Sequence, residues 1–262
     1  MGEAGIASKA GIARSADSPV FWKAIGLILT DSILSHIVRG KNSVYFRGMN
    51  KETMLAVLET FRPIFGQVKP VSKEGYFTVI LSINTVGRDR VNCLKELVGL
   101  VRTIITKPYV LEKIGREEKA AFLAGLIDGD GYIGKKGGYM AISYKADTYK
   151  GRVVGHFLSL LSRDGSIKLG KYRGRPHYEH TFTFMDHSFL SEVVRYTFVP
   201  HKHRRLKEML ANILKMRQCS LNVDELYKLL KLAKTVYVDY RKDRGSRVLI
   251  IYLDLRQKRL PR

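Results

Sequence analysis

Two aspartates at the ends of similar apolar segments are the residues of this chain whose type and spacing best suit chemistry. Asp130 lies near the end of the segment 122–131, which reads FLAGLIDGDG, and Asp31 lies near the end of a poorer copy, AIGLILTDS, at 24–32. Asp31 and Asp130 are 99 residues apart, and the matched glycines and Leu-Ile pairs keep the same offset. This offset indicates an internal repeat of domain size, with one acid at the same place in each copy.

Each aspartate is expected to follow a buried helix, because the residues before it are apolar helix formers. Small residues form a stripe on one face of each segment, at Gly26 and Thr30 in the first copy and at Gly125 and Gly129 in the second. Residues three or four apart share a helix face, and small side chains there let two backbones approach closely. The sequence therefore predicts that the two helices pack against each other through these faces.

A carboxylate at the C-terminal end of a helix stands beside free carbonyl groups and the negative pole of the helix dipole. Two such ends side by side, at Asp31 and Asp130, would concentrate negative charge. Hard divalent cations such as Mg²⁺ and Ca²⁺ bind carboxylate and carbonyl oxygens. The repeat therefore predicts a paired acidic site for metal on a pseudo-twofold axis.

The acidic segment also fits two simpler structures. A tight turn leading into a hairpin is one, since Asp-Gly steps are typical of turns. A calcium loop is the other, with Asp128 in its first position and Asp130 in its third. A calcium loop also requires a third acid, a glycine and a glutamate at fixed positions. This chain has Tyr132, Ile133 and Tyr139 at those positions, which excludes the loop. The second copy at a domain-sized offset favours the metal site over the turn.

The charge of the whole chain is a second strong signal. Lys and Arg number 46 against 24 Asp and Glu, a net charge of +22 over 262 residues. Such an excess favours a polyanion, and nucleic acid over membrane, because no apolar run reaches about 18 residues. The two cysteines, Cys93 and Cys219, form neither a CxxC motif nor a disulfide framework. With no signal segment at the start, we expect an intracellular protein, cytoplasmic in a prokaryote, with an organelle left open.

The segment 123–131, LAGLIDGDG, resembles the motif that names the LAGLIDADG homing endonucleases, and differs from it only at Gly129, where the motif has alanine. The first copy keeps the glycine, the Leu-Ile pair and the final acid, but has Leu29 for the first acid and Ser32 for the last glycine. The resemblance extends over about residues 19–215.

The resemblance implies an α+β fold of two pseudo-symmetric αββαββα halves, packed through their LAGLIDADG helices, each with an antiparallel sheet that binds DNA. We expect the first half at 19–105, a connector at 106–116 and the second half at 117–218. Residues 1–18 are expected to form a flexible arm, and 219–262 a C-terminal extension beyond the repeat.

The patterns along the chain predict the elements within each half. Helices are expected at about 19–30, 50–65, 90–105, 117–129, 148–162, 188–197, 204–216 and 222–236. Strands are expected at about 33–38, 43–49, 68–71, 76–84, 132–134, 139–145, 166–172, 178–185 and 248–255. Ser18 and Asn50 are the predicted N-caps of the first two helices, and Asn222 with Glu225 forms a capping box.

Basic and aromatic side chains gather on the predicted strands and turns, a combination suited to phosphate contacts and guanine recognition. A solvated surface explains any one of them, but the set recurs in both copies. The predicted DNA-binding residues are Arg39, Lys41, Tyr45, Arg47, Lys69, Lys73, Lys135, Lys136, Tyr144, Lys145, Lys168, Lys171, Arg173, Arg175, His177 and His180. Their histidines lack cysteine or acidic partners and are poor zinc signals.

The resemblance also implies a catalytic basic residue beside the metals. Lys107 follows Asp31 by 76 residues and Lys202 follows Asp130 by 72, both after the last helix of their copy. The catalytic candidates are therefore Asp31, Asp130, Lys107 and Lys202. Lys202 lies in the basic run HKHRR, for which phosphate contact is the simpler interpretation.

The activity implied is that of a monomeric endonuclease in intron homing, which makes a double-strand break in a long, imperfectly palindromic DNA site. Asp31 and Asp130, with the carbonyls of Thr30 and Gly129, would bind Mg²⁺, with Mn²⁺ or Ca²⁺ as substitutes in binding. Two other classes stay open: a maturase that binds intron RNA, and a DNA-binding protein that does not cleave. The two acids favour the nuclease, because a pure binder gains nothing from two repelling carboxylates.

Overall fold

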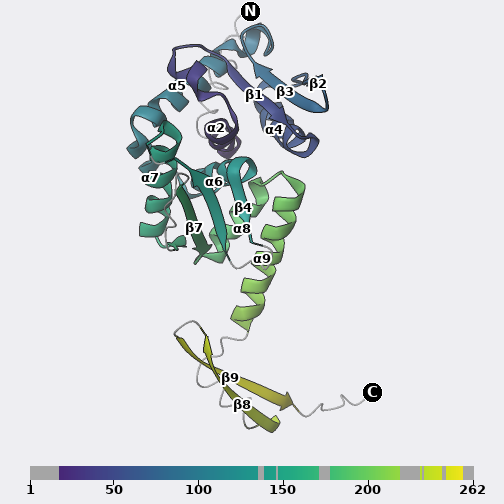
Figure 1. Ribbon diagram of the computed structural model, residues 1–262, viewed down its shortest axis with the longest axis vertical. Helices are drawn as coiled ribbons and strands as arrows, with labels where there is room; N and C mark the ends of the chain where they lie inside the picture. The colour runs from purple at the N-terminus through teal and green to yellow at the C-terminus, as the bar shows by residue number, and fades with distance from the viewer. Residues whose placement is uncertain are drawn as a thin grey trace, which may run out of the picture. The chain divides into compact units, whose positions relative to one another are not determined.

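The structure is a computed structural model that describes residues 18–134, 139–145, 147–170, 178–218, 231, 233–243 and 246–255. It contains helices and antiparallel sheets, as the sequence predicts (Figure 1). The chain forms two compact units, which divide between Asn212 and Ile213. Within the described part of the chain, no helix is both long and apolar enough to cross a membrane.

The elements follow the order of the repeat. The first copy contains α2 (Pro19–Asp31), α3 (Leu34–Val38), β1 (Val44–Met49), α4 (Lys51–Phe65), β2 (Val71–Lys73), β3 (Tyr76–Leu81), η1 (Arg88–Arg90) and α5 (Val91–Thr106), and is followed by η2 (Pro108–Glu112). The second copy contains α6 (Arg116–Asp130), β4 (Gly131–Ile133), β5 (Met140–Tyr144), α7 (Tyr149–Arg163), β6 (Ile167–Leu169), β7 (Tyr178–Phe184), α8 (His187–Tyr196) and α9 (Pro200–Gln218). The hairpin of β8 (Ala233–Asp243) and β9 (Ser246–Leu255) belongs to the second compact unit.

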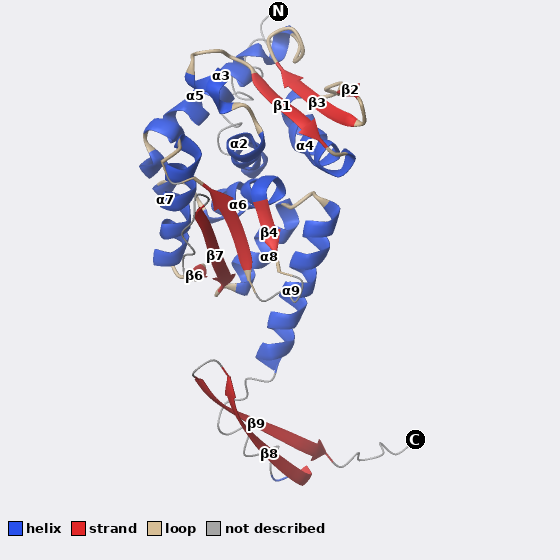
Figure 2. Cartoon of the chain, in the orientation of Figure 1, coloured by secondary structure: helices blue, strands red, loops and turns tan. Residues whose placement is uncertain are grey.

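Each copy of the repeat contributes one antiparallel sheet, with strand order β1-β3-β2 in the first and β4-β5-β7-β6 in the second (Figure 2). Burial alternates over the first residues of β1, as expected for a sheet with one buried face. In β1, Val44 and Phe46 are buried, whereas Tyr45 is half-buried and Arg47 exposed. Helix α4 packs on β1 and β3, and α7 packs on β5 and β6. Exposed side chains such as Arg47 lie on the face of the first sheet away from α4.

Helices α2 and α6 pack against each other at the centre of the repeat (Figure 1). A Cβ atom on Gly26 would collide with the carbonyl oxygen of Phe122, and one on Gly125 would lie 2.8 Å from the amide nitrogen of Leu27. Only glycine allows backbones this close. The predicted packing of the two motif helices is confirmed, and it explains why both are apolar on nearly every side.

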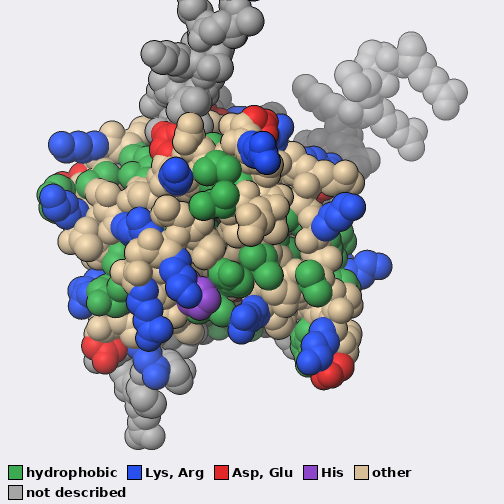
Figure 3. Space-filling model, turned by 90° about the horizontal axis from the view of Figure 1, so that it is seen from above, with side chains coloured by type: hydrophobic (Ala, Val, Ile, Leu, Met, Phe, Trp, Pro, Cys, Tyr) green, Lys and Arg blue, Asp and Glu red, His purple; other side chains and the backbone are tan. Residues whose placement is uncertain are grey.

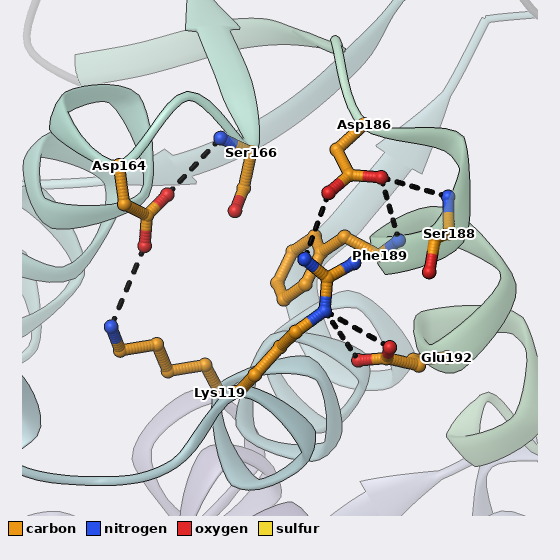
Figure 4. Close-up of polar contacts among 8 residues, drawn as sticks. Lys119, Asp164, Ser166, Asp186, Ser188, Phe189 and Glu192 are labelled. Atoms are coloured by element: carbon orange, nitrogen blue, oxygen red, sulfur yellow. Dashed lines mark hydrogen bonds and ion pairs between the residues drawn. The ribbon is translucent and has the colours of Figure 1, made fainter.

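A polar network holds the beginning of α6 against α8 and the turn before β6 (Figure 4). Arg116 contacts the carboxylates of Asp186 at 2.8 Å and Glu192 at 3.0 Å. Lys119 lies 3.4 Å from the carboxylate of Asp164. Because α6 is fixed at its first turn and along its glycine face, the position of its acidic last residue is set by the same packing.

The strand predicted at 33–38 is wrong, because the chain there forms the short helix α3. The apolar residues of this segment lie four apart as well as side by side, so their spacing suits a helix as much as a strand. Arg102 of α5 donates a hydrogen bond at 2.9 Å to the carbonyl of Ile37, in the last turn of this helix. Beside this segment, a single β-bridge joins Ser32 to Phe46 of β1. Because the segment forms no strand, the first sheet has one strand fewer than the second.

Two further predictions are corrected. Helix α9 begins at Pro200 and not at 204, because Pro suits the first helical position. The helix predicted at 222–236 is wrong over 233–236, which belong to β8, where polar and apolar residues alternate. The start of that helix, with Asn222 and Glu225, lies outside the described residues.

The two predicted N-caps have different outcomes. Asn50 accepts a hydrogen bond from the Thr53 amide at 2.9 Å and caps α4, as predicted. Ser18 precedes α2 but makes no side-chain capping bond, so the proline that follows it is the main start signal of that helix.

Candidate catalytic and metal centre

The two repeated aspartates end α2 and α6, and these helix ends lie against each other. Asp31 is the last residue of α2 and Asp130 the last residue of α6. A Cβ atom on Gly129 would collide with the side chain of Thr30 and lie 3.3 Å from the carboxylate carbon of Asp31. Glycine at this position therefore keeps the two acidic helix ends in contact.

The carboxylate of Asp31 has an oxygen that the described part of the protein does not satisfy. Its Oδ2 is buried and has no hydrogen-bond partner. Burial raises the pKa of Asp31, while the positive charges of Lys202 and Lys150 lower it. A buried and unpartnered carboxylate oxygen is costly, and a bound cation would satisfy it.

The donor set near this oxygen fits a hard divalent cation with few protein ligands. Among the described residues, no three His, Cys, Asp or Glu side chains are grouped as a metal would require. A cation here would take the carboxylates of Asp31 and Asp130 together with backbone carbonyls and water. Mg²⁺ commonly binds through one or two carboxylates and keeps several waters.

The ammonium of Lys202 caps the last turn of α6. It donates at 2.8 Å to each of three successive carbonyl oxygens, those of Ile127, Asp128 and Gly129. The Ile127 carbonyl also accepts the amide of the C-cap residue Gly131. Carbonyls of the last turn carry the negative pole of the helix dipole, so a lysine is favourable there. Burial lowers the pKa of Lys202, whereas the nearby charges of Asp128 and Asp31 raise it.

A buried ion pair places Lys202 at this helix end. The carboxylate of Asp128 accepts the backbone amides of Phe198 at 2.9 Å and Val199 at 3.1 Å, just before α9 begins. Lys23 of α2 lies 2.9 Å from the same carboxylate and 3.0 Å from the centroid of the Phe198 ring. The first acid of the motif therefore fixes the segment that leads to Lys202.

A second lysine reaches the acidic pair, and the sequence did not identify it. Lys150, in the first turn of α7, forms an ion pair with Asp130 and donates to the carbonyl of Thr30 at 3.4 Å. Burial lowers the pKa of Lys150, while the charge of Asp31 raises it. One local signal was present: a lysine in the first turn opposes the helix dipole, and such mismatches tend to occur at functional positions.

The two copies of the repeat are unequal at this centre. Lys107 is exposed beyond the end of α5 and makes no described contact with the acidic pair. The first copy has Leu29 where the second has Asp128, so no carboxylate is present there to hold the segment before Lys107. The structure thus brings one of the two predicted lysines to the site, together with Lys150.

The difference extends to the helices that follow the second strands. Asn50 and Thr148 cap α4 and α7 in the same way, each accepting the amide three residues later. Two residues after each cap, the first copy has Glu52 and the second has Lys150. Glu52 lies 2.8 Å from Nδ1 of His201, the neighbour of Lys202.

Most of the predicted DNA-binding residues that the structure describes are exposed. On the face drawn in Figure 3, basic side chains are spread across the surface and acidic ones are few. The exposed predicted residues are Arg39, Lys41, Arg47, Lys69, Lys73, Lys145 and Lys168. Tyr45 is half-buried, with the guanidinium of Arg47 5.8 Å from the centre of its ring. These residues lie on both halves of the repeat.

Tyr144 corrects the predicted interface. It lies on the covered face of β5 and is 5% exposed, and burial raises its pKa to about 12. It packs beneath the sheet because it follows Met140 and Ile142 at even spacing, which places all three side chains on the same face. Tyr144 is therefore a core residue and not a surface contact.

His180 lies on β7. The remaining predicted interface residues, Lys135, Lys136, Lys171, Arg173, Arg175 and His177, lie outside the described residues.

Comparison with known proteins gives one family match and several structural neighbours. No curated protein matches this chain. The structure is similar to mesophilic variants of the homing endonuclease I-DmoI, at 14% identity and TM-score 0.44 over 68% of this chain and 96% of that one. It is similar to the homing endonuclease I-WcaI bound to its DNA recognition sequence, at 16% identity and TM-score 0.47 over 72% and 86%. It is also similar to DUF199/WhiA from Thermatoga maritima, at 12% identity and TM-score 0.43 over 82% and 66%.

Likeness at these TM-scores leaves the function of this chain open. The family match is the stronger finding, because a LAGLIDADG-like domain is matched over residues 117–180, from the motif helix to β7. The resemblance stated from the sequence is thereby confirmed, and residues 117–180 match a LAGLIDADG-like domain.

Proposed function

We propose that this protein is a divalent-metal-dependent DNA endonuclease that acts as a monomer and cleaves both strands of a long, specific duplex site. One observation carries the proposal: two acids from matched helix ends meet, and Asp31 offers a buried oxygen that has no described partner. Two partly buried lysines, Lys150 and Lys202, flank the same point. Few purely structural sites gather this much charge, whereas phosphodiester hydrolysis requires it.

The residues have distinct roles in the proposed reaction. Asp31 and Asp130 would hold the metal. The chemistry supplied by a divalent cation held there would be a lower pKa for a water nucleophile and stabilisation of the leaving 3′-oxygen. Lys202 already uses its three N–H donors on carbonyls, so it contributes positive charge at a set position and does not hydrogen-bond to a phosphate.

The exposed basic side chains would position the duplex. The net charge of the chain is +22. When its basic side chains neutralise phosphates, counterions are released from the nucleic acid, which gives high affinity at low salt. Arg47 and Lys168 lie on outward faces of the two sheets, one in each copy. Contacts from both copies would extend along the DNA, which suits a long site.

A second candidate is a DNA-binding protein of the same fold that does not cleave. The carbonyls of Thr30 and Gly129, expected to help bind metal, each accept a hydrogen bond from a lysine. Lys107 does not reach the acidic pair. If the lysines already neutralise the carboxylates of Asp31 and Asp130, these acids have less need of a metal ion, which would favour a binding protein over a nuclease.

Binding and cleavage can be tested separately. Duplexes bound in Ca²⁺ would be selected from a random pool and sequenced, and the selected site would then be incubated with protein and Mg²⁺. We expect cleavage of both strands by the wild type and none by Asp31→Asn or Asp130→Asn, with all three binding in Ca²⁺. Asp89→Asn, which removes an exposed carboxylate 3.5 Å from the guanidinium of Arg90, is the matched control. Binding without cleavage by the wild type would support the second candidate, and tighter binding to intron RNA than to any duplex would support a maturase.

A further inference from the structure

Lys150 occupies the place where a metal would bind. Its ammonium contacts the carboxylate of Asp130 and donates to the carbonyl of Thr30, two of the four ligands expected for the cation. Burial lowers the pKa of Lys150, and the third expected ligand, Asp31, is close enough for its charge to oppose this lowering. A divalent cation at these oxygens would stand at contact distance from a like-charged ammonium, and the repulsion disfavours binding of both.

The charge of the centre points the same way. Asp31 and Asp130 supply two negative charges, and Lys150 and Lys202 supply two positive ones. Adding a divalent cation would leave an excess positive charge in a partly buried place, which is costly. Lys202 is held by three carbonyls, whereas the side chain of Lys150 is 22% exposed and lies in the first turn of its helix. Lys150 is therefore the lysine free to leave.

We propose that Lys150 is a built-in counter-ion that competes with the divalent cation for Asp130, so that metal enters the centre only when this ammonium moves away. The inference rests on the metal site of the proposed function. An anionic phosphate brought near the centre would offer Lys150 another partner, because ammonium groups bind phosphate as readily as carboxylate. Metal binding to the free protein is then weak, and it improves when Lys150 is removed.

The 262-residue chain without DNA provides the test, with Ca²⁺ and Mn²⁺ as the probes. Affinity is measured by calorimetry, and the rise in melting temperature with added metal is measured in parallel, since a ligand that binds only the folded state stabilises it. We expect Lys150→Met to bind Ca²⁺ at least about tenfold more tightly than the wild type, because a unit charge at contact distance is removed. The gain should vanish in the double variant Lys150→Met/Asp130→Asn.

Arg152→Met is the matched control. Arg152 lies two residues along the same helix, is exposed, and has its guanidinium 5.0 Å from the centre of the Tyr149 ring. Its removal subtracts the same charge without freeing Asp130, so solvent screening should keep the change in Ca²⁺ affinity below about threefold. Lys150→Gln provides a second variant if the methionine form is poorly folded by circular dichroism.

The outcomes separate the two proposals. Equal or weaker Ca²⁺ binding by both Lys150 variants, with measurable binding by the wild type, would overturn the counter-ion and leave the metal site standing. An equal gain in Ca²⁺ affinity in Arg152→Met would also overturn it, because the gain would then follow from the lower net charge of the protein and not from freeing Asp130. No binding of Ca²⁺ or Mn²⁺ by any variant would remove the metal site itself, and with it the proposed metal-dependent reaction.

Discussion

Lys23 of α2 and Asp128 of α6 form an ion pair at 2.9 Å, and both side chains are fully buried. The pair joins the two copies of the repeat at their central helices. Asp128 also accepts two backbone amides before α9, so the same carboxylate links helix packing to the position of Lys202. One buried charge pair thus connects the core of the protein to its candidate centre.

Replacing Asp128 by asparagine should reduce stability strongly. The amide keeps the shape of the side chain but leaves the Lys23 ammonium buried without an opposite charge. Breaking one partner of a buried pair typically costs about 3–5 kcal/mol. Urea denaturation measures the change in the free energy of unfolding. The double variant Lys23→Met/Asp128→Asn should recover part of the loss, whereas additive losses would contradict coupling between the two side chains.

Stability should also depend on pH through Lys23. Burial lowers its pKa from 10.5 to about 8, against the opposing effect of Asp128. Between about pH 8 and 10.5 the unfolded chain therefore binds more protons at Lys23 than the folded protein does, so the contribution of Lys23 to stability rises with pH across this range.

The measurement is the difference in the free energy of unfolding between the wild type and Lys23→Met, determined at pH 7 and pH 10. The difference should shift in favour of the wild type at pH 10 by up to about 3 kcal/mol, since one pKa unit corresponds to about 1.4 kcal/mol. A pH-independent difference would show that Lys23 keeps its ordinary pKa in the folded state.

Two glycine-to-alanine variants should have opposite effects on the melting temperature. A Cβ atom at Gly125 would lie 2.8 Å from the amide nitrogen of Leu27, so Gly125→Ala must push the central helices apart. Overpacking of this kind typically costs about 1–3 kcal/mol. A Cβ atom at Gly99 of α5 meets nothing within 4 Å, so Gly99→Ala should stabilise its helix by about 0.5–1 kcal/mol. Equal melting temperatures for both variants would contradict close packing of α2 on α6.

Salt should weaken DNA binding steeply if both sheets contact phosphates. With roughly 8 contacts, the logarithm of the binding constant should fall with the logarithm of salt concentration at a slope near −7. Replacing Lys145 and Lys168 by methionine should make the slope shallower by about one to two units, with little change in base preference. Fluorescence anisotropy at several salt concentrations measures the slope. Lys95→Met, on an exposed position of α5, is the control, and an equal change there would place the interface elsewhere.

The pairing of the central helices could be predicted from the sequence because it depends on local features. Gly26 and Gly125 recur at one offset within apolar segments, and close helix contact is the main physical use of such a pattern. The meeting of Asp31 and Asp130 follows directly, since each acid comes at the same distance from the paired glycines. The metal proposed for them remains a prediction.

Other features depend on contacts between segments far apart in the chain. The segment 33–38 has apolar residues that suit either helix or strand, and a hydrogen bond from Arg102 satisfies the end of the helix that forms. Tyr144 could be placed on a strand from its sequence, but which face of the sheet α7 covers decided that it is buried.

The composition of the candidate centre shows the same division. Its acids could be named from a repeated motif, because each one ends a central helix, and Lys202 could be named from the family resemblance. Lys150 could not, because it reaches Asp130 only after α7 folds back over the sheet and brings its first turn to the end of α6. The sequence determined which negative charges would meet at the helix ends, and only the tertiary structure decided that Lys150 joins Lys202 in neutralising them, since that depends on side chains converging from separate helices.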